Sequence, residues 1–327
     1  MIQITNIASH DIGLRLTEYF KDCDEPIYII SPFIEISALE KILQNVETSE
    51  ISIVTTWKLS DIKSGISTLD LYPLCKQKGW TLYINNLIHA KIYSKSFKNC
   101  FLGSMNCTNK ALFNPLGNIE CVYYMNMMNV GNRIELNKII AESILVNETI
   151  YQQYLNKIEQ IETGGIPEDD FELNDLSPYY VFQLPTVKDP HELWEYIQNP
   201  KYFTDEDASY CEHDLAIYTS GTMEYASESE FINDLKDHFL SHPFIKKIDS
   251  KITYEGMRFG AYKELVRDIC ADVPVPFAKD LTRFIQNLYG WFTIIFPEFY
   301  YIDIPGSHSQ CLHKVKSKTD ETHNVVR

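Results

Sequence analysis

The residues best suited to chemistry lie between positions 87 and 121. His89 offers an imidazole that can act as a nucleophile, and Lys91 offers a fixed cation two positions later. Ser104 and Asn106 follow in a Gly-Ser-Met-Asn turn and add neutral hydrogen-bond donors. A phosphodiester needs a nucleophile for its phosphorus and several donors for its oxygens. This set of side chains therefore fits chemistry at a phosphodiester.

The local pattern predicts how the chain presents these groups. From His89 onward the sequence alternates polar and apolar side chains, so on a strand His89, Lys91 and Tyr93 would project from one face. Gly103 permits a tight turn that would aim the following serine and asparagine at the same spot. Glu120 stands in a later strand-like run among apolar neighbours. A buried carboxylate needs a partner, and a histidine is a natural one.

His89-x-Lys91 followed by Gly103-Ser104-x-Asn106 resembles the HxK and GSxN signature of the phospholipase D superfamily. The two motifs occur in the family's order, with the serine fifteen positions after the histidine as in its small nucleases. The resemblance covers roughly residues 20–150. It implies that Glu120 is the carboxylate that orients the histidine.

One position departs from the family's full motif. An aspartate stands there five residues after the lysine, where this chain has Ser96. Because the single-motif nuclease branch often lacks that aspartate, the departure argues more against a lipid-cleaving member than against catalysis. The resemblance implies a metal-independent endonuclease that cleaves DNA through a phosphohistidine, in restriction or phage defence. A phospholipase or phospholipid transferase, and a non-catalytic nucleic-acid-binding protein, are the alternatives, and RNA is the alternative substrate.

The mechanism that the resemblance implies uses two histidines, one as nucleophile and one as proton donor. Only one HxK in this chain is followed by a GSxN, so one chain would supply half a site. We therefore expect a homodimer in which both subunits contribute His89 and in which Lys91, Ser104 and Asn106 hold the phosphate oxygens. Three further residues are expected to bind the substrate: Ser31, Lys58 and Lys110. The sequence leaves open whether a helicase or translocase partner delivers the DNA.

Composition limits the remaining function classes. The eight cysteines form no CxxC pair and follow no secretory leader, so we expect reduced thiols in a cytoplasmic protein. The net charge of −16 divides into −3 for residues 1–163, −14 for 164–250 and +1 for 251–327. Because phosphate binding depends on local basic patches, this total does not exclude a nucleic-acid substrate. The sequence predicts no membrane span, nucleotide cofactor or metal site.

Apolar periodicity predicts the elements that must position these groups. Strands are expected over 26–30, 51–56, 80–84, 89–93, 100–102 and 119–124, and helices over 9–22, 37–45 and 67–79. This β-α-β-α-β order predicts an α/β fold, for which the resemblance implies a phospholipase D-like α-β-α sandwich over residues 1–163. Residues 132–162 are expected to form one long amphipathic helix or two.

A Gly-Gly-Ile-Pro run at 164–167 predicts a domain boundary. An acidic linker and connecting segment is expected over 164–226, followed by a mixed α+β domain for recognition or regulation over 227–327. Its helices are expected over 228–239, 261–270 and 277–289, and its strands over 291–296, 299–304 and 310–315. Helices followed by a hairpin resemble a winged helix, which leaves DNA recognition and a protein-contact or dimer-forming role open as alternatives.

Overall fold

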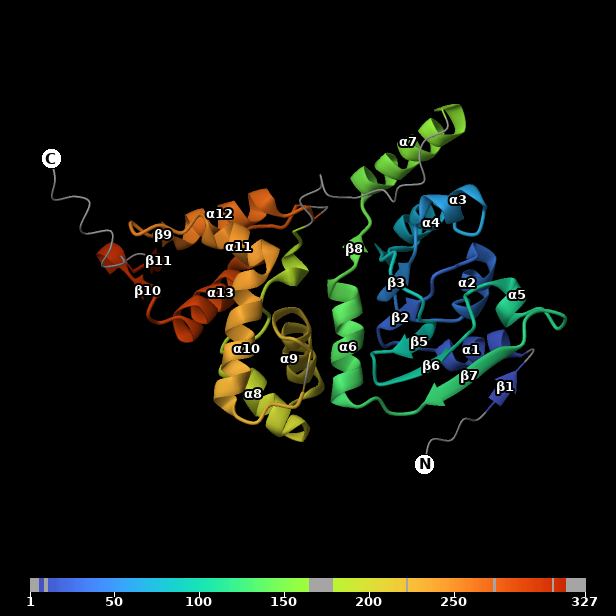
Figure 1. The fold of residues 1–327 in the computed structure, drawn as a ribbon, viewed down its shortest axis with the longest axis horizontal. Helices are drawn as coiled ribbons and strands as arrows, with labels where there is room; N and C mark the ends of the chain where they lie inside the picture. Colours follow the sequence, from blue (N-terminus) through green and yellow to red (C-terminus); the bar gives the residue numbers. More distant parts are fainter. Residues whose placement is uncertain are drawn as a thin grey trace. The chain divides into compact units, whose positions relative to one another are not determined.

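The computed structural model describes residues 6–8, 11–164, 179–221, 223–272, 275–307 and 309–315 (Figure 1). The chain divides into two compact units, residues 1–173 and 174–327, here called unit 1 and unit 2. Unit 1 is built around a large mixed sheet, and unit 2 is mainly helical with a second, small sheet. The predicted α/β class is therefore confirmed.

Unit 1 contains eight strands: β1 (Asn6–Ala8), β2 (Ile27–Ile30), β3 (Ile51–Thr55), β4 (Thr81–Ile84), β5 (Ile92–Lys95), β6 (Asn99–Gly103), β7 (Glu120–Met125) and β8 (Ile144–Leu145). They form one sheet in the order β1-β7-β6-β5-β2-β3-β4-β8. β2, β3 and β4 run parallel, and every other neighbouring pair is antiparallel. β2 and β3 are runs of mostly β-branched side chains, largely buried, as expected of strands covered on both faces.

The helices of unit 1 are α1 (Ile12–Phe20), α2 (Ile36–Ile42), α3 (Leu59–Lys63), α4 (Leu71–Lys78), α5 (Asn109–Leu112), α6 (Val130–Ala141) and α7 (Glu148–Gly164). α1, α2 and α5 contact one another, and in Figure 1 the sheet lies between this group and α6. Ile12, Leu16 and Phe20 recur at every fourth position of α1, so one buried stripe of that helix faces the core. Gly79 ends α4 with a φ of 72°, a conformation that glycine adopts without strain.

One sequence expectation for unit 1 needs correction, and the structure decides another between its two alternatives. The strand expected over 89–93 is wrong at its start, because β5 begins at Ile92. The amphipathic region over 132–162 forms two helices, and β8 lies between them and pairs with β4. The two residues of β8 are too few to give a period-2 pattern in the sequence.

The segment expected to connect the two domains is largely folded. It contains α8 (His191–Gln198) and α9 (Asp205–Tyr218), which lie in unit 2 and bury side chains such as Leu193 and Leu215. The fully buried carboxylate of Asp214 accepts hydrogen bonds from the amides of Thr186 at 2.9 Å and Val187 at 2.8 Å. The linker prediction is therefore wrong for residues 179–221. Their many acidic side chains suggested a linker, although the apolar residues between them are buried in a folded unit. Residues 165–178 of the predicted linker lie outside the described residues.

The rest of unit 2 comprises α10 (Glu228–Ser241), α11 (Pro243–Asp249), β9 (Met257–Arg258), α12 (Phe259–Ile269), α13 (Leu281–Ile295), β10 (Tyr300–Asp303) and β11 (Cys311–Lys314). The small sheet is antiparallel in the order β10-β11-β9. The strand expected over 291–296 is wrong, because Leu288, Trp291, Phe292 and Ile295 keep a helical period and are buried along α13. Within the described ranges, no helix has both the length and the apolar character needed to cross a bilayer.

Candidate active site

The predicted site residues lie together on the side of the unit 1 sheet that is formed by the ends of its strands. This side is here called the site edge. β2, β3 and β4 end at this edge, and antiparallel pairing brings the ends of three further strands to it. Ile30 pairs with Ile92, Ile92 with Leu102, and Gly103 with Val122. Such an edge is where open α/β sheets usually bind ligands. The adjoining loops and strand ends carry seven of the eight predicted site residues: Ser31, Lys58, His89, Lys91, Ser104, Asn106 and Glu120.

His89 lies in the loop between β4 and β5, and its side chain is exposed. Two asparagines fix this loop. The backbone amide of Asn85 donates to the carbonyl of Thr55 at 2.9 Å, and the side-chain oxygen of Asn86 accepts from the amide of Trp57 at 2.9 Å. These contacts tie the loop to the end of β3, which leaves the imidazole open to a ligand.

Lys91 lies directly before β5 and is only 6% exposed. Its Nζ donates to the backbone carbonyl of His89 at 2.6 Å, so the cation and the imidazole belong to one small hydrogen-bonded loop. Burial lowers the pKa of the Lys91 ammonium from its ordinary value, and the nearby Glu120 carboxylate opposes that change. The cation is therefore held in place by the fold and does not extend freely into solvent.

The turn after β6 brings Ser104 against the start of β7. Gly103 donates to the carbonyl of Lys91 at 3.2 Å, and the amide of Ser104 donates to the carbonyl of Cys121 at 3.0 Å. The Ser104 hydroxyl accepts from the amide of Cys121 at 2.9 Å and donates to the Glu120 carboxylate. A Cβ at position 103 would lie 1.9 Å from the carbonyl oxygen of Cys121. Glycine is therefore required for this close approach.

Glu120 is buried, and its hydrogen-bond partners differ from the histidine that the sequence led us to expect. Its carboxylate accepts hydrogen bonds from the Ser104 hydroxyl and from the Asn118 side-chain amide, the latter at 3.1 Å. In the part of the chain that the structure describes, no hydrogen bond joins it to the His89 ring. The reason lies in the strand order, since β6 separates β7, which begins with Glu120, from β5, which follows the histidine.

Asn106 and Ser31 lie at the same site edge, but the hydrogen bonding of their side chains differs. Asn106 Oδ1 is buried and has no hydrogen-bond partner among the described residues, which is uncommon for a buried polar atom. The Ser31 hydroxyl is fully used: it donates to the carbonyl of Phe33 at 2.9 Å and accepts from the amide of Cys107 at 3.1 Å. This buried serine joins two loops, which does not support its predicted contact with the substrate.

The two further lysines occupy different surroundings. Lys58 is half-buried and directly precedes α3 after the end of β3, and Lys110 is exposed on α5. Neither ammonium group is paired with a carboxylate of the described residues. Lys58 is therefore placed to add positive charge at the site edge.

Three asparagines that help to hold the site were missed by the sequence analysis: Asn85, Asn86 and Asn118. An Asn-Asn pair directly after a predicted strand is the signal that could have indicated a fixed loop, since asparagine side chains stabilise turns. Asn118 follows Gly117 in a second turn-forming pair directly before β7.

The arrangement places an exposed imidazole, a buried cation, an unpaired amide oxygen and a serine–carboxylate pair at one sheet edge. Such a set offers a nucleophile and positive charge to an anionic group that approaches from solvent. No protein-family model and no curated protein matches the chain, so these residues alone define the candidate site.

Proposed function

We propose that unit 1 is a phospholipase D-like α-β-α sandwich that cleaves DNA as a metal-independent phosphodiesterase. The observation that carries this proposal is the convergence of His89, Lys91 and the Ser104–Glu120 pair at one edge of the sheet. The exposed imidazole supplies the nucleophile, and the buried lysine supplies a charge that does not have to be ordered during the reaction.

The proposed reaction has two displacement steps. An imidazole nitrogen of His89 attacks the phosphorus, a P–N bond forms, and the P–O bond to the leaving group breaks while His89 of the partner subunit protonates the departing oxygen. Water then attacks the phosphohistidine, and that same partner imidazole takes the proton from the water. The P–N bond breaks and the imidazole is regenerated.

The geometry supports different roles for the polar residues around the phosphate. The single proton of the Ser104 hydroxyl is donated to Glu120, so it is not available to a phosphate oxygen in this arrangement. We assign Ser104 and Glu120 as positioning residues that fix the turn and the electrostatic surroundings of Lys91. The Lys91 ammonium and the side-chain N–H groups of Asn106 are then the donors that stabilise the charge on the nonbridging oxygens.

Exposed apolar side chains beside the site support the proposed dimer. Leu87 is 94% exposed two residues before His89, and Leu116 is 93% exposed in the loop that leads to Glu120. Ile119, next to Glu120, is also exposed. Large apolar side chains that gather on a surface are typical of a protein contact. A second copy that covers them would bring a second imidazole to the same edge.

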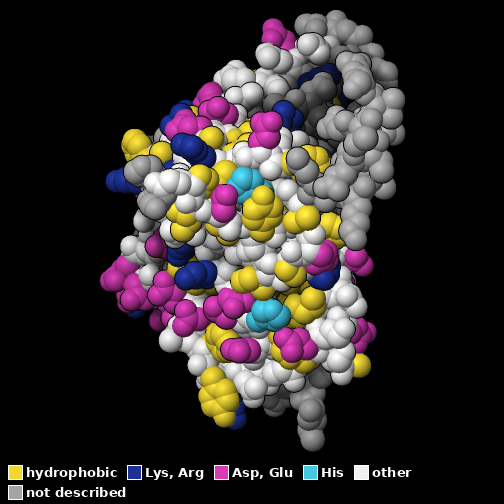
Figure 2. Space-filling view, turned by 90° about the vertical axis from the view of Figure 1, so that its left-hand side faces the viewer, with side chains coloured by type: hydrophobic (Ala, Val, Ile, Leu, Met, Phe, Trp, Pro, Cys, Tyr) yellow, Lys and Arg dark blue, Asp and Glu magenta, His cyan; other side chains and the backbone are white. Residues whose placement is uncertain are grey.

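The burial and charge of unit 2 favour a regulatory or protein-contact role over recognition of DNA sequence. The order β9-α12-α13-β10-β11, with β11 central in the sheet, is the connectivity of a winged helix. The helix before the hairpin would have to enter the DNA groove. Most of α13 is buried, however, and Asn287 and Trp291 donate to backbone carbonyls of the 185–187 segment at 2.9 Å. Asp and Glu side chains also gather on the face drawn in Figure 2, which is unfavourable for binding phosphates.

The test is incubation of the purified chain with plasmid and with single-stranded DNA in EDTA. We expect cleavage by the parent protein, none by His89→Ala, and parental cleavage by His191→Ala, which removes an exposed histidine of unit 2. Cleavage of phospholipid vesicles with intact DNA would favour the phospholipase alternative. DNA binding without cleavage by the parent protein would favour the non-catalytic alternative.

Mixing subunits tests the shared site. Excess His89→Ala chains that exchange with parent chains should lower cleavage below the parental amount, because each mixed dimer lacks one of the two imidazoles. Leu87→Asp should give monomers and abolish cleavage. Met127→Asp is the matched control, since Met127 is a large apolar side chain that is 79% exposed but follows the far end of β7. Full activity of a monomer would contradict the shared site.

A further inference from the structure

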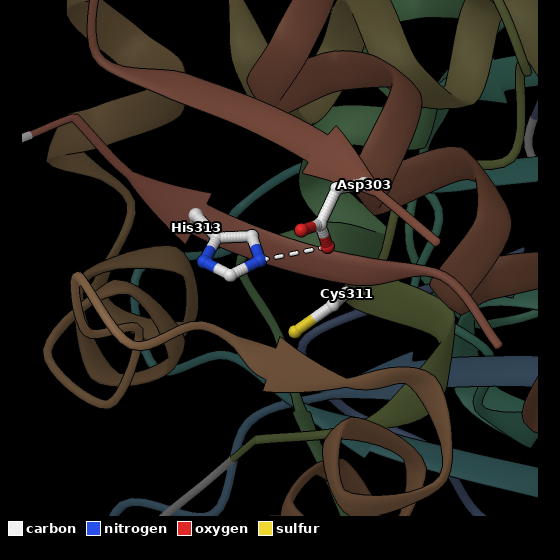
Figure 3. Close-up of side chains that lie close together, drawn as sticks. All are labelled: Asp303, Cys311 and His313. Carbon is white, nitrogen blue, oxygen red and sulfur yellow. Dashed lines mark hydrogen bonds and ion pairs between the residues drawn. The ribbon is translucent and has the colours of Figure 1, made fainter. Parts of the chain in front are cut away.

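A second cluster of reactive side chains lies in the small sheet of unit 2. The ligand atoms of Asp303, Cys311 and His313 all lie within 4.8 Å of one another (Figure 3). Asp303 is the register partner of Cys311 across β10 and β11, and His313 follows Cys311 by two positions on the same strand. All three side chains therefore project from one face of the sheet. In the described part of the chain, no other three His, Cys, Asp or Glu side chains meet in this way.

The His313 ring is held in one orientation. Its Nδ1 lies 3.2 Å from the backbone carbonyl of Tyr254, its Nε2 lies 2.9 Å from Asp303 Oδ1, and its ring stacks on Tyr301 at a centroid distance of 4.7 Å. Histidines that bind metals commonly donate their second N–H to a backbone carbonyl. When Nδ1 donates to Tyr254, the Nε2 lone pair of a neutral ring faces the carboxylate, and a cation between these two groups satisfies both.

Gly256 closes the other side of the cluster. It has a φ of 81°, and a Cβ there would lie 2.3 Å from His313 Cε1 and 2.7 Å from Cys311 Sγ. The chain therefore passes directly over the imidazole and the thiol. Cys311 and His313 are buried, whereas about half of the Asp303 side chain is exposed. An ion would thus enter from the Asp303 side.

We propose that Asp303, Cys311 and His313 bind a divalent cation of the zinc class, with a fourth coordination position open to water. Thiolate, imidazole and carboxylate are the protein ligands that zinc takes, and a thiolate disfavours magnesium and calcium. Ligand atoms around tetrahedral zinc lie about 3.3–3.6 Å apart. The present ligand atoms lie within 4.8 Å of one another, so a bound ion would have to draw them to these separations. The thiol loses its proton as the metal–sulfur bond forms.

The bound ion has a structural consequence that is independent of the proposed nuclease. It joins β10 to β11 at the strand pair next to their connecting loop, and through His313 it is linked to the carbonyl of Tyr254. Because only the folded sheet brings the three ligands together, the ion stabilises unit 2 by mass action.

The first experiment is a cobalt titration of the full chain after treatment with chelator. We expect one cobalt ion per chain, a near-ultraviolet charge-transfer band from a thiolate ligand, and the visible bands of tetrahedral cobalt. Zinc should displace the cobalt and raise the unfolding temperature of unit 2. Absence of the thiolate band would overturn the proposal and leave the Asp303–His313 contact as an ion pair without metal.

Matched variants assign the ligands. Cys311→Ser should abolish the charge-transfer band, and Asp303→Asn, at a half-exposed position, should weaken cobalt binding at least tenfold. Cys270→Ser is the control, because Cys270 is a half-buried cysteine of unit 2 outside the cluster. Retention of the full band by Cys311→Ser, or its loss in Cys270→Ser, would place the ion elsewhere and overturn the assignment.

Discussion

The Ser104 hydroxyl donates its proton to the Glu120 carboxylate across the ends of β6 and β7. The same hydroxyl accepts from the amide of Cys121 at 2.9 Å, so the serine has no remaining donor for a substrate. Serine and glutamate therefore act as one unit that shapes the site edge beside Lys91.

This pairing predicts non-additive effects on cleavage. Ser104→Ala and Glu120→Met should each lower the single-turnover rate by about 100-fold, because the turn that carries Asn106 moves away from the phosphate. The double variant should be little slower than either single variant, since each change breaks the same hydrogen bond. Rates measured in a double-mutant cycle check this, and multiplicative losses would refute a joint role.

A second prediction concerns Lys91. Lys91→Met should lower the cleavage rate by about 100- to 1000-fold, because it removes a fixed charge from the transition state while it retains most of the side-chain volume. Its stability should match or exceed that of the parent, since no charge is then buried. Lys95→Met, on the half-buried Lys95 of β5, is the control and should cleave normally. Equal rates for both variants would remove Lys91 from the mechanism.

Gly103→Ala should destabilise unit 1 by about 3 kcal/mol, because the new methyl group would lie 1.9 Å from the carbonyl oxygen of Cys121 in β7. Gly260→Ala offers a matched control in α12, where the space around the Cβ is open. Alanine is the better helix former, so this control should gain about 0.5–1 kcal/mol. Denaturant unfolding measures both changes, and a neutral Gly103→Ala would show that the turn tolerates a side chain.

The stability of unit 2 should depend on pH through His242. Burial lowers the pKa of His242 to about 4, and its Nδ1 has no hydrogen-bond partner in the described structure. The unfolded chain, with a pKa of about 6.5, binds more protons between these two values. The free energy of unfolding should therefore fall by about 3 kcal/mol as the pH decreases from about 6.5 to 4.

His242→Phe should remove this loss, because phenylalanine keeps the ring contact with Tyr218 but does not titrate. Chemical unfolding at several pH values provides the measurement. His191→Phe, at an exposed position, should retain the parental dependence. The same acid sensitivity in His242→Phe would assign the effect to other groups.

Chelation separates the nuclease from the proposed metal site. Cleavage by the parent protein should persist in EDTA, because no step of the reaction at His89 uses an ion. Cys311→Ser should cleave with and without EDTA, while its unfolding temperature should no longer respond to zinc. Cleavage that stops in EDTA in both proteins would contradict the proposed mechanism but not the metal site.

The sequence predicts the sheet of unit 1 well where apolar runs are long. β2, β3 and β4 follow runs of Ile, Val, Leu, Thr and Tyr in which Ser52 is the one other residue, and Gly79 ends α4 where it was expected to. The alternation of polar and apolar residues predicted a strand that begins at His89. In the structure, hydrogen bonds of Asn85 hold His89 in the loop before β5. Period and propensity describe single elements and do not report such contacts.

The sequence predicted which residues lie at the candidate site, but not which of them form hydrogen bonds with one another. Two spaced motifs indicated the residue types that meet at the edge, whereas the partner of Glu120 depends on which strands are neighbours. In unit 2, Cys311 and His313 could have been noticed as a pair on one strand face. Asp303 joins them only through hairpin register, which long-range pairing sets.

The large sheet ends in very short strands, with three residues in β1 and two in β8. Few backbone donors and acceptors are therefore exposed along its outer borders, which limits aggregation through added strands. Two copies of this chain are consequently poorly suited to join by extending one sheet into the other. A symmetric pair formed through unit 1 is therefore expected to use loops and helices, and the loops with the most exposed leucines are those beside His89 and Glu120.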